Sequence, residues 1–436
     1  MSNEEGEMKD NNKKGGTLTL IKIAYRNIWR NKRRTAFCFT AVGVIVFFIA
    51  IYTSFRGGLN KSIHDMVQVF ETGHINVVST QYDAENEYMP VQYPVSSSRE
   101  NPGGKSWKEL AASIKEIPGV REVFPRITTI ATLQESTIKH AILWGINMEE
   151  EKKINNFNIS GRNDGIIEGR YPAPGSNECA IGHLFAKKTG LSIGDRIPLK
   201  TVSAQFSDKI WSPVITGIFN YEYRKVDESY IIVDFERFQR LLVLGEATQQ
   251  LVIYANNEKL SRQITVSVRD MLGQQNVVTN WRDNFWVVYF GETEVMNNLI
   301  YIVLLIVASF LIINTVTMII HERIKEIGMM GSLGMTRFEI IKVFFFESLF
   351  LAAFGALAGV IVGGIVSGIV SIFPLRLMDV YGSTVSDIPA SSTLFFEFSL
   401  FSLFKAWLMG VVIASVFTLF PSLKSAFVEP VEALRR

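Results

Sequence analysis

The sequence predicts an α-helical membrane protein with four transmembrane helices and a large α+β extracytoplasmic domain inserted between helices 1 and 2. Three observations predict this fold class. Four long segments are almost free of charge, and the long polar stretch 56–294 separates the first from the second. The composition, 48% hydrophobic and 20% charged with a mean hydropathy of +0.19, is too apolar for an ordinary soluble protein. It is also too polar for a chain that lies wholly within a membrane.

The four apolar segments each meet the length that a bilayer requires. A helix needs roughly 20 apolar residues to cross a hydrocarbon core of about 30 Å. Segments 35–55, 295–320 and 348–375 contain no charged residue. The fourth, 403–423, has a shorter uncharged run after Lys405, which the uncharged residues 398–404 lengthen. We therefore expect four membrane-spanning helices.

Basic residues predict the orientation of these helices. Lysines and arginines gather before the first span, after the second and after the fourth, and such residues stay on the cytoplasmic side. Both termini and the loop 321–346 are then cytoplasmic, whereas 56–294 and the short loop 376–402 are extracytoplasmic. At the ends we expect a disordered tail over 1–16, an amphipathic interfacial helix over 17–34 and a short tail over 424–436.

The extracytoplasmic region reads as a mixed α+β domain that two stalks connect to the spans. Residues 56–70 continue the first helical pattern, and 281–294 lead into the second span. Apolar runs of strand length and residues at helical spacing alternate between them. We expect strands at 74–78, 120–133, 141–146, 214–219, 230–233 and 250–254, and helices at 107–117, 179–190 and 260–272.

Catalytic and cofactor motifs are absent from the sequence. Gly104-Lys105-Ser106 lacks the glycine of a P-loop, because Arg99 stands five residues before Gly104. Cys179 and His183 have metal-like spacing but no companions, which favours a structural pair on a helix. The net charge of +2 gives no sign of nucleic-acid binding. We expect no enzyme activity and no cofactor, metal or nucleic acid bound by this chain.

The loop 321–346 carries more than a cytoplasmic turn requires. Two acidic residues four apart share a helix face with basic neighbours, an apolar stripe runs at three-residue steps, and glycines permit a bend back towards the membrane. A simple basic loop needs neither the acids nor the stripe, but docking into the groove of a partner uses both. The acidic and basic residues are Glu322, Arg323, Lys325 and Glu326, the stripe is Ile324, Ile327, Met330 and Leu333, and the glycines are Gly328, Gly331 and Gly334.

Glycines also recur within the third predicted span. Gly355, Gly359 and Gly363 are four residues apart, a spacing that lets two helices approach closely in lipid. This pattern fits packing within one chain at least as well as a seam between two copies.

Several stretches together resemble a known family. Glu322-Arg323-x-x-Glu326-Ile327-Gly328, followed by Leu333-Gly334-Met335-Thr336-Arg337, resembles the signature of FtsX-like permeases, the membrane subunits of the MacB/Lol class of ABC transporters. Residues 24–35, 169–195 and 420–435 are similar to three further parts of that family, in the same order along the chain.

The resemblance implies a function as a non-catalytic permease subunit of the bacterial inner membrane. A separate ABC ATPase would bind ATP-Mg and push on the coupling helix through Glu322, Arg323, Lys325, Glu326, Ile327, Gly328 and Gly334. Two permeases, identical or related, would pair and transmit this motion to their outer domains. The expected task is lipoprotein release; efflux of drugs or peptides, or regulation of an extracytoplasmic enzyme as by cell-division FtsX, are the alternatives.

Overall fold

A computed structural model describes residues 21–26, 29, 32–81, 91–95, 106–133, 138–155, 157, 165–292, 294–322, 324–373 and 396–426. The chain divides into two compact units. The helical unit comprises Met1–Gly58, Thr293–Pro374 and Phe395–Arg436, and the sheet unit comprises Leu59–Glu292 and Leu375–Leu394. The predicted tail 1–16, most of the predicted loop 376–402 and the end of the tail 424–436 lie outside the described residues.

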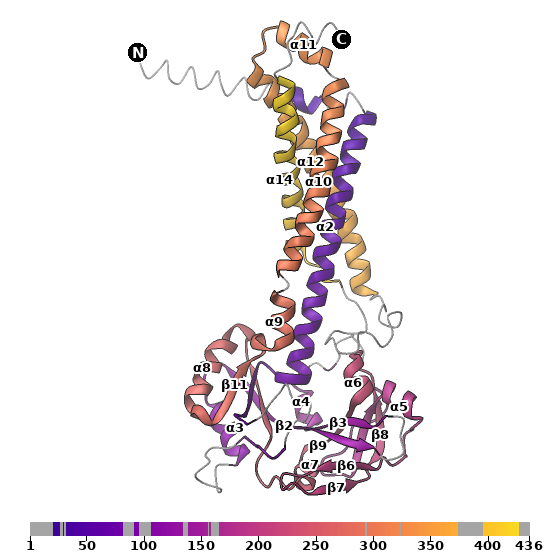
Figure 1. Ribbon diagram of the computed structural model, residues 1–436, viewed down its shortest axis with the longest axis vertical. Coiled ribbons are helices and arrows are strands. Elements are labelled where there is room, and N and C mark those ends of the chain that lie inside the picture. The colour runs from indigo at the N-terminus through magenta and orange to yellow at the C-terminus, as the bar shows by residue number, and fades with distance from the viewer. Residues whose placement is uncertain are drawn as a thin grey trace. The chain divides into compact units, whose positions relative to one another are not determined.

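Four long helices that lie side by side form the helical unit (Figure 1). They are α2 (Lys32–Met66), whose first part belongs to this unit, α10 (Glu294–Glu322), α12 (Arg337–Ile372) and α14 (Leu400–Ala426). Apolar side chains from all four helices make one buried cluster, centred on Val46, Ala356 and Ala414. Their outward faces are also apolar, as on helices that are surrounded by lipid.

Long apolar helices overlap three of the four predicted spans. Among the described residues, Thr35–Thr72, Arg337–Ile372 and Leu400–Thr418 are long and apolar enough to cross a membrane. These segments overlap the first, third and fourth predicted spans. Within α10, the apolar segment Asn298–Asn314 is shorter than these three segments.

The sheet unit is built on one mixed sheet. Its described strands follow the order β11-β1-β10-β2-β3-β9-β5-β8-β4, with β6 beside β2 and β7 beside β6. The pairs β3–β9 and β5–β8 are parallel and the others antiparallel. The strands are β1 (Ile75–Ser79), β2 (Val120–Leu133), β3 (His140–Ile146), β4 (Ile166–Gly169), β5 (Glu178–Gly182), β6 (Leu199–Val202), β7 (Asp208–Trp211), β8 (Val214–Phe219), β9 (Tyr230–Asp234), β10 (Gln250–Ala255) and β11 (Asn276–Asn280).

Helices complete the unit around this sheet. The first stalk continues α2 through the π-helix η1 (Val67–Thr72), and the second is α9 (Phe285–Glu292), which follows the 3₁₀ turn η4 (Trp281–Asp283). The others are α3 (Trp107–Lys115), α4 (Met148–Glu151), α5 (His183–Thr189), α6 (Arg224–Ser229), α7 (Phe235–Leu241) and α8 (Ser261–Leu272), with 3₁₀ turns η2 (Glu258–Leu260) and η3 (Gly273–Gln275).

The long strand β2 joins two hydrophobic cores. Val123 belongs to the core that packs under α3 and α8 together with β1 and β10. Ile127 and Ala131, further along the same strand, belong to the core of β3, β5, β9, α5 and α7. These three residues are four apart and so lie on the same face of β2, and its 14 residues are enough to reach both cores in succession. The sheet unit therefore has two lobes on a shared strand.

The stretch 169–195 forms a compact corner of the lobe that contains β3, β5 and β9. Gly169 has φ +74°, and a Cβ there would lie 2.2 Å from the carbonyl oxygen of Thr216, so only glycine fits. Arg170 then pairs with Glu178 through two hydrogen bonds of 2.8 and 2.6 Å. The Ala173 amide donates to the same carboxylate at 2.9 Å. These contacts fix the entrance to β5.

The predicted strands agree with β1, β2, β3, β8, β9 and β10, and the predicted helices 107–117 and 260–272 agree with α3 and α8. The predicted helix 179–190 is wrong in its first part. Residues Glu178–Gly182 are strand β5, which has β8 on one side and β9 on the other, and the helix begins only at His183. A short apolar run buried on both faces has no period that separates strand from helix.

Candidate functional site

The predicted coupling segment contains a short helix, α11 (Ile324–Ser332), between α10 and α12. Ile327 is buried against Ile340 and Phe344 at the start of α12, and Met330 and Met335 pack around them. Gly328 is buried too. This small apolar cluster holds α11 against the end of a long apolar helix.

The chain turns at the end of α11 with two local devices. Gly334 has φ +93°, a conformation that glycine adopts without strain. Thr336 and Glu339 then form a capping box, in which the Thr336 amide donates to Glu339 Oε2 at 2.9 Å and the Glu339 amide donates to Thr336 Oγ1 at 3.4 Å. Gly331 lies inside α11, so only the last glycine of the predicted bend makes the turn.

The outward surface of this segment differs from the predicted stripe. Met329, Leu333 and Phe338 are 52%, 80% and 69% exposed, whereas Ile327 is 3% exposed. Three-residue steps rotate by about 60° each on a helix with 3.6 residues per turn, so the predicted stripe winds around α11. Ile327 supports the helix from within, and we call Met329, Leu333 and Phe338 the outer apolar face.

The charged residues of the segment differ in exposure. Glu322 and Lys325 are exposed and Glu326 is half-buried. Arg323 lies outside the described residues. Exposed apolar residues in one short segment with charges of both signs are typical of a surface that binds another protein.

The glycines of the third predicted span lie against α2. A Cβ at Gly355 would lie 2.9 Å from the Phe39 carbonyl oxygen, and one at Gly363 would lie 2.9 Å from the Cβ of Ala50. At Gly359 the distance to the carbonyl oxygen of Gly43 would be only 2.3 Å. The glycines therefore let two helices of one chain meet at their backbones, and Gly43 is the partner that sequence analysis missed.

Comparison with protein families gives two matches that divide the chain between them. Residues 298–430 match the family model of the FtsX-like permease C-terminal region. Residues 35–279, more than half of the chain, match that of the MacB-like periplasmic core domain. This chain belongs to the FtsX-like permeases with a MacB-like core. Family membership and the long apolar helices identify an ABC transporter permease of the inner membrane.

Individual relatives of this FtsX-like permease are distant but cover much of it. The lipoprotein-releasing system transmembrane protein LolC of Xylella fastidiosa is 22% identical over 340 residues, which are 76% of this chain and 81% of that protein. LolE of Haemophilus influenzae is 21% identical over 253 residues, 56% of this chain and 59% of its own.

Two solved structures also resemble part of this chain. The periplasmic region of MacB from Actinobacillus actinomycetemcomitans superposes with a TM-score of 0.31 and 9% identity, over 48% of this chain and 88% of that one. The extracellular domain of the ABC-type transporter YknZ gives a TM-score of 0.30 and 14% identity, over 47% and 100%.

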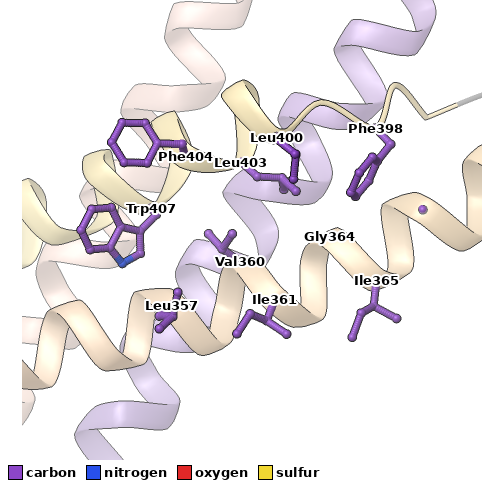
Figure 2. Close-up of a pocket in the computed structure, with 11 residues that line it drawn as sticks. Leu357, Val360, Ile361, Gly364, Ile365, Phe398, Leu400, Leu403, Phe404 and Trp407 are labelled. Carbon is purple, nitrogen blue, oxygen red and sulfur yellow. The ribbon is translucent and has the colours of Figure 1, made fainter.

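The membrane helices of this permease also border an apolar groove. It lies between α12 and α14 and has a volume of about 690 Å³. Figure 2 shows Leu357, Ile361 and Ile365 from α12 and Phe404 and Trp407 from α14 around it. The Trp407 indole N–H donates to the Ala353 carbonyl oxygen at 3.1 Å, so this polar group is already satisfied. The groove is suited to hydrocarbon.

The structure also shows what surrounds the residues that were weighed as metal or phosphate ligands in the sequence, Cys179, His183 and Ser106. Cys179 is buried on β5, where burial raises the pKa of its thiol. His183 Nδ1 lies 3.8 Å from the buried carboxylate of Asp227. Ser106 caps α3 by accepting a hydrogen bond from the Lys108 amide. Within the described part of the chain, no three His, Cys, Asp or Glu residues gather as metal ligands.

Proposed function

We propose that this permease transmits mechanical work from a separate ABC ATPase, which binds ATP-Mg, to its own extracytoplasmic domain. The observation that carries the proposal is α11. Ile327 fixes this helix to α12, and the residues of the outer apolar face are exposed: Met329 in α11, Leu333 in the following turn and Phe338 in α12. A partner that pushes on this face displaces α12 with it, because the buried cluster leaves α11 little freedom of its own.

The residues of the coupling segment take different parts in this proposal. Leu333 and Met329 supply apolar contact, and Glu322, Arg323, Lys325 and Glu326 supply charges at the rim. Ile327, Gly328 and Gly334 shape the segment. This division follows from exposure, except that Gly334 is assigned from its φ of +93° in the turn and Arg323, outside the described residues, from its charge.

The proposed topology has four spans, with α10 as the second and both termini cytoplasmic. α10 extends over Glu294–Glu322, a length that crosses a bilayer at about 1.5 Å per residue. The basic residues that follow it, and those before α2, favour the cytoplasmic side. Two permeases, identical or related, pair in the assembly that we propose.

The proposed substrate is a lipoprotein of the envelope. LolC and LolE, which belong by name to lipoprotein-releasing systems, align with over half of the chain. An apolar groove suited to hydrocarbon between α12 and α14 is consistent with a lipid-rich setting. Efflux of drugs or peptides and regulation of an extracytoplasmic enzyme are the alternatives.

A pair of matched variants tests the coupling role. Leu333→Asp places a charge on the outer apolar face, whereas Val266→Asp places one on an exposed site of α8. We expect affinity purification of Leu333→Asp from its native membrane to recover at least about tenfold less ATPase subunit, which corresponds to about 1.4 kcal/mol. Val266→Asp recovers the wild-type amount. Equal recovery from both variants would contradict the coupling role.

Reconstituted membranes test the substrate. The complex in proteoliposomes should release a bound lipoprotein when ATP is added, and not when the ATPase is inhibited. ATP-driven movement of a drug or peptide without lipoprotein release would favour efflux. A hydrolase whose activity follows ATP turnover would favour regulation.

A further inference from the structure

The first stalk ends inside the sheet unit as a π-helix. η1 (Val67–Thr72) follows α2 directly, and the chain then reverses at Gly73, where φ is +62°. The last turn of any helix leaves carbonyl groups without a partner in the helix itself. Such groups need partners when they are buried, and Gln68, Val69 and Thr72 are all buried.

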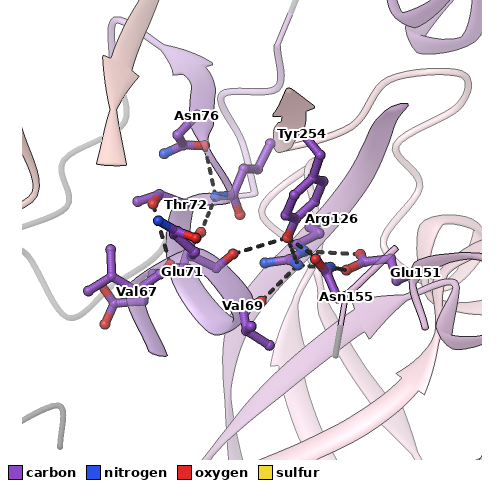
Figure 3. Close-up of polar contacts among 11 residues, drawn as sticks. Val67, Val69, Glu71, Thr72, Asn76, Arg126, Glu151, Asn155 and Tyr254 are labelled. Atoms are coloured by element: carbon purple, nitrogen blue, oxygen red, sulfur yellow. Dashed lines mark hydrogen bonds and ion pairs between the residues drawn. The ribbon is translucent and has the colours of Figure 1, made fainter. Parts of the chain in front are cut away.

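Side chains from two neighbouring strands supply these partners (Figure 3). Tyr254 donates its hydroxyl to the Gln68 carbonyl at 3.0 Å. Arg126 donates from Nη2 to the Val69 carbonyl at 2.8 Å. Gln250 donates from Nε2 to the Glu71 carbonyl at 2.7 Å. We call these three contacts the stalk joint.

The register of the sheet explains why these side chains act together. Gln250 of β10 stands opposite Arg126 of β2, and Tyr254 lies on the same face of β10 four residues on. The alternate residues Leu251, Ile253 and Ala255 pack in the apolar core under α3 and α8. One face of β10 is therefore anchored in the core and the other holds the stalk.

Arg126 is itself fixed from several sides. Its Nε and Nη2 donate to the two oxygens of Glu151 at 3.0 and 2.6 Å, and both side chains are fully buried. Nη2 also donates to the Tyr254 hydroxyl at 3.0 Å, and Asn155 donates to the same hydroxyl at 2.8 Å. Burial opposes the charge of Arg126, but Glu151 and Tyr254 outweigh it and raise the pKa of the guanidinium.

A buried charge network is a costly way to fill this space. A protein is often as stable, or more stable, when apolar residues of similar volume replace a buried ion pair. Apolar contacts are, however, non-directional, whereas each hydrogen bond also fixes the direction from donor to acceptor. Hydrogen bonds to three defined carbonyl oxygens fix both rotation and translation of η1 relative to β2 and β10.

The second stalk is tied to the same point. Asn284 donates from Nδ2 to the carboxylate of Glu71 at 3.0 Å, and its own Oδ1 accepts from the Trp286 amide at the start of α9. Ile63, Val67, Trp281 and Val287 pack together beside this contact. The end of the first stalk and the beginning of the second are thus joined where both meet the sheet.

We infer that Arg126 and Tyr254 are positioning residues for force transmission: they lock the end of the first stalk to β2 and β10, so that its displacement moves the sheet. This inference rests on the proposed function, because it assigns the place where the work enters the extracytoplasmic domain. Neither residue needs to touch cargo or the ATPase.

The test uses the full-length permease with its ATPase in lipid nanodiscs. Tyr254→Phe removes the hydroxyl that serves Gln68, Arg126 and Asn155 while keeping the ring. Tyr221→Phe is the matched control, because Tyr221 is also buried and its hydroxyl contacts Tyr171 at 2.6 Å. Amide hydrogen exchange over 67–72 and the number of lipoproteins released per ATP are measured for each variant.

We expect Tyr254→Phe to exchange about tenfold faster over 67–72 than the control, as for the loss of a buried hydrogen bond. It should hydrolyse ATP at the wild-type rate but release several-fold less lipoprotein per ATP, whereas Tyr221→Phe matches the wild type in both. Equal exchange in the two variants, or undiminished release per ATP by Tyr254→Phe, would overturn the inference. A wild-type complex that releases no lipoprotein would overturn the proposed substrate instead, and the exchange data would still decide the joint.

Discussion

Gly43 of α2 and Gly359 of α12 meet backbone to backbone in the helical unit. A Cβ built on Gly359 would stand 2.3 Å from the carbonyl oxygen of Gly43 and 3.0 Å from the Phe47 amide nitrogen. Contact this close has no room for a methyl group. Between membrane helices the driving force is van der Waals packing at small residues. This pair therefore sets how closely α12, which follows α11, approaches α2, which leads to the sheet unit.

Gly359→Ala should destabilise the permease by about 1–3 kcal/mol, because the added methyl group overpacks the seam. Thermal unfolding in detergent, followed by tryptophan fluorescence, measures the change. Gly368→Ala is the control: it lies on the same helix, but its Cβ would meet only Phe398, at an ordinary 3.7 Å. If the two variants unfold at the same temperature, the close approach of α2 and α12 does not exist in the membrane.

Gly334→Ala should weaken the turn between α11 and α12. A Cβ at this position meets nothing within 4 Å, so the cost is backbone strain at φ +93° alone, about 1–2 kcal/mol. We expect reduced stimulation of the partner ATPase, measured as hydrolysis with and without permease. Gly331→Ala, inside α11, should leave stimulation unchanged, since alanine is favoured in a helix. A normal rate with Gly334→Ala would show that coupling tolerates a shifted turn.

The membrane helices were the most predictable part of the fold. Hydropathy is summed over about 20 residues, so single exceptions such as Lys405 do not hide a span. Long alternating runs such as Val120–Leu133 were equally clear. The strands β4, β6 and β7, of four residues each, were missed because so short a run shows no period.

The orientation of the side chains in the proposed coupling segment could not be predicted. Three-residue steps do not keep to one side of a helix, so Ile327 is buried whereas Leu333 is exposed. No local sequence pattern indicates the stalk joint. Arg126 lies 25 residues from Glu151 and 128 from Tyr254, and only the sheet register brings them together.

Arg126→Met should destabilise the permease by about 3–5 kcal/mol, because Glu151 then remains buried without its partner charge. Adding Glu151→Leu removes that unpaired charge, and the double variant should recover part of the loss. Urea unfolding of the full-length chain, followed by tryptophan fluorescence, gives both values. Additive losses in the double variant would mean that the ion pair is not coupled.

The stability of the sheet unit should depend on acid pH through Glu178. Hydrogen bonds from Arg170 lower the pKa of this carboxyl group, and those from the Ala173 amide and Ser176 add to them, so that it falls to about 2. An ordinary glutamate has a pKa of about 4.3 in an unfolded chain. Because the pKa is lower in the folded state, the stabilisation is complete above the unfolded pKa and is lost as the pH falls from there towards 2.

Glu178→Gln should therefore lower the free energy of unfolding at pH 7 and flatten its decline between about pH 4.3 and 2. Urea midpoints of the full-length chain at several pH values measure both effects. Glu168→Gln, which changes an exposed carboxylate on β4, two strands away from β5 in the sheet, should keep the wild-type profile. A Glu178→Gln profile that runs parallel to the wild type through this range would show that the pairing with Arg170 does not hold the carboxylate ionised.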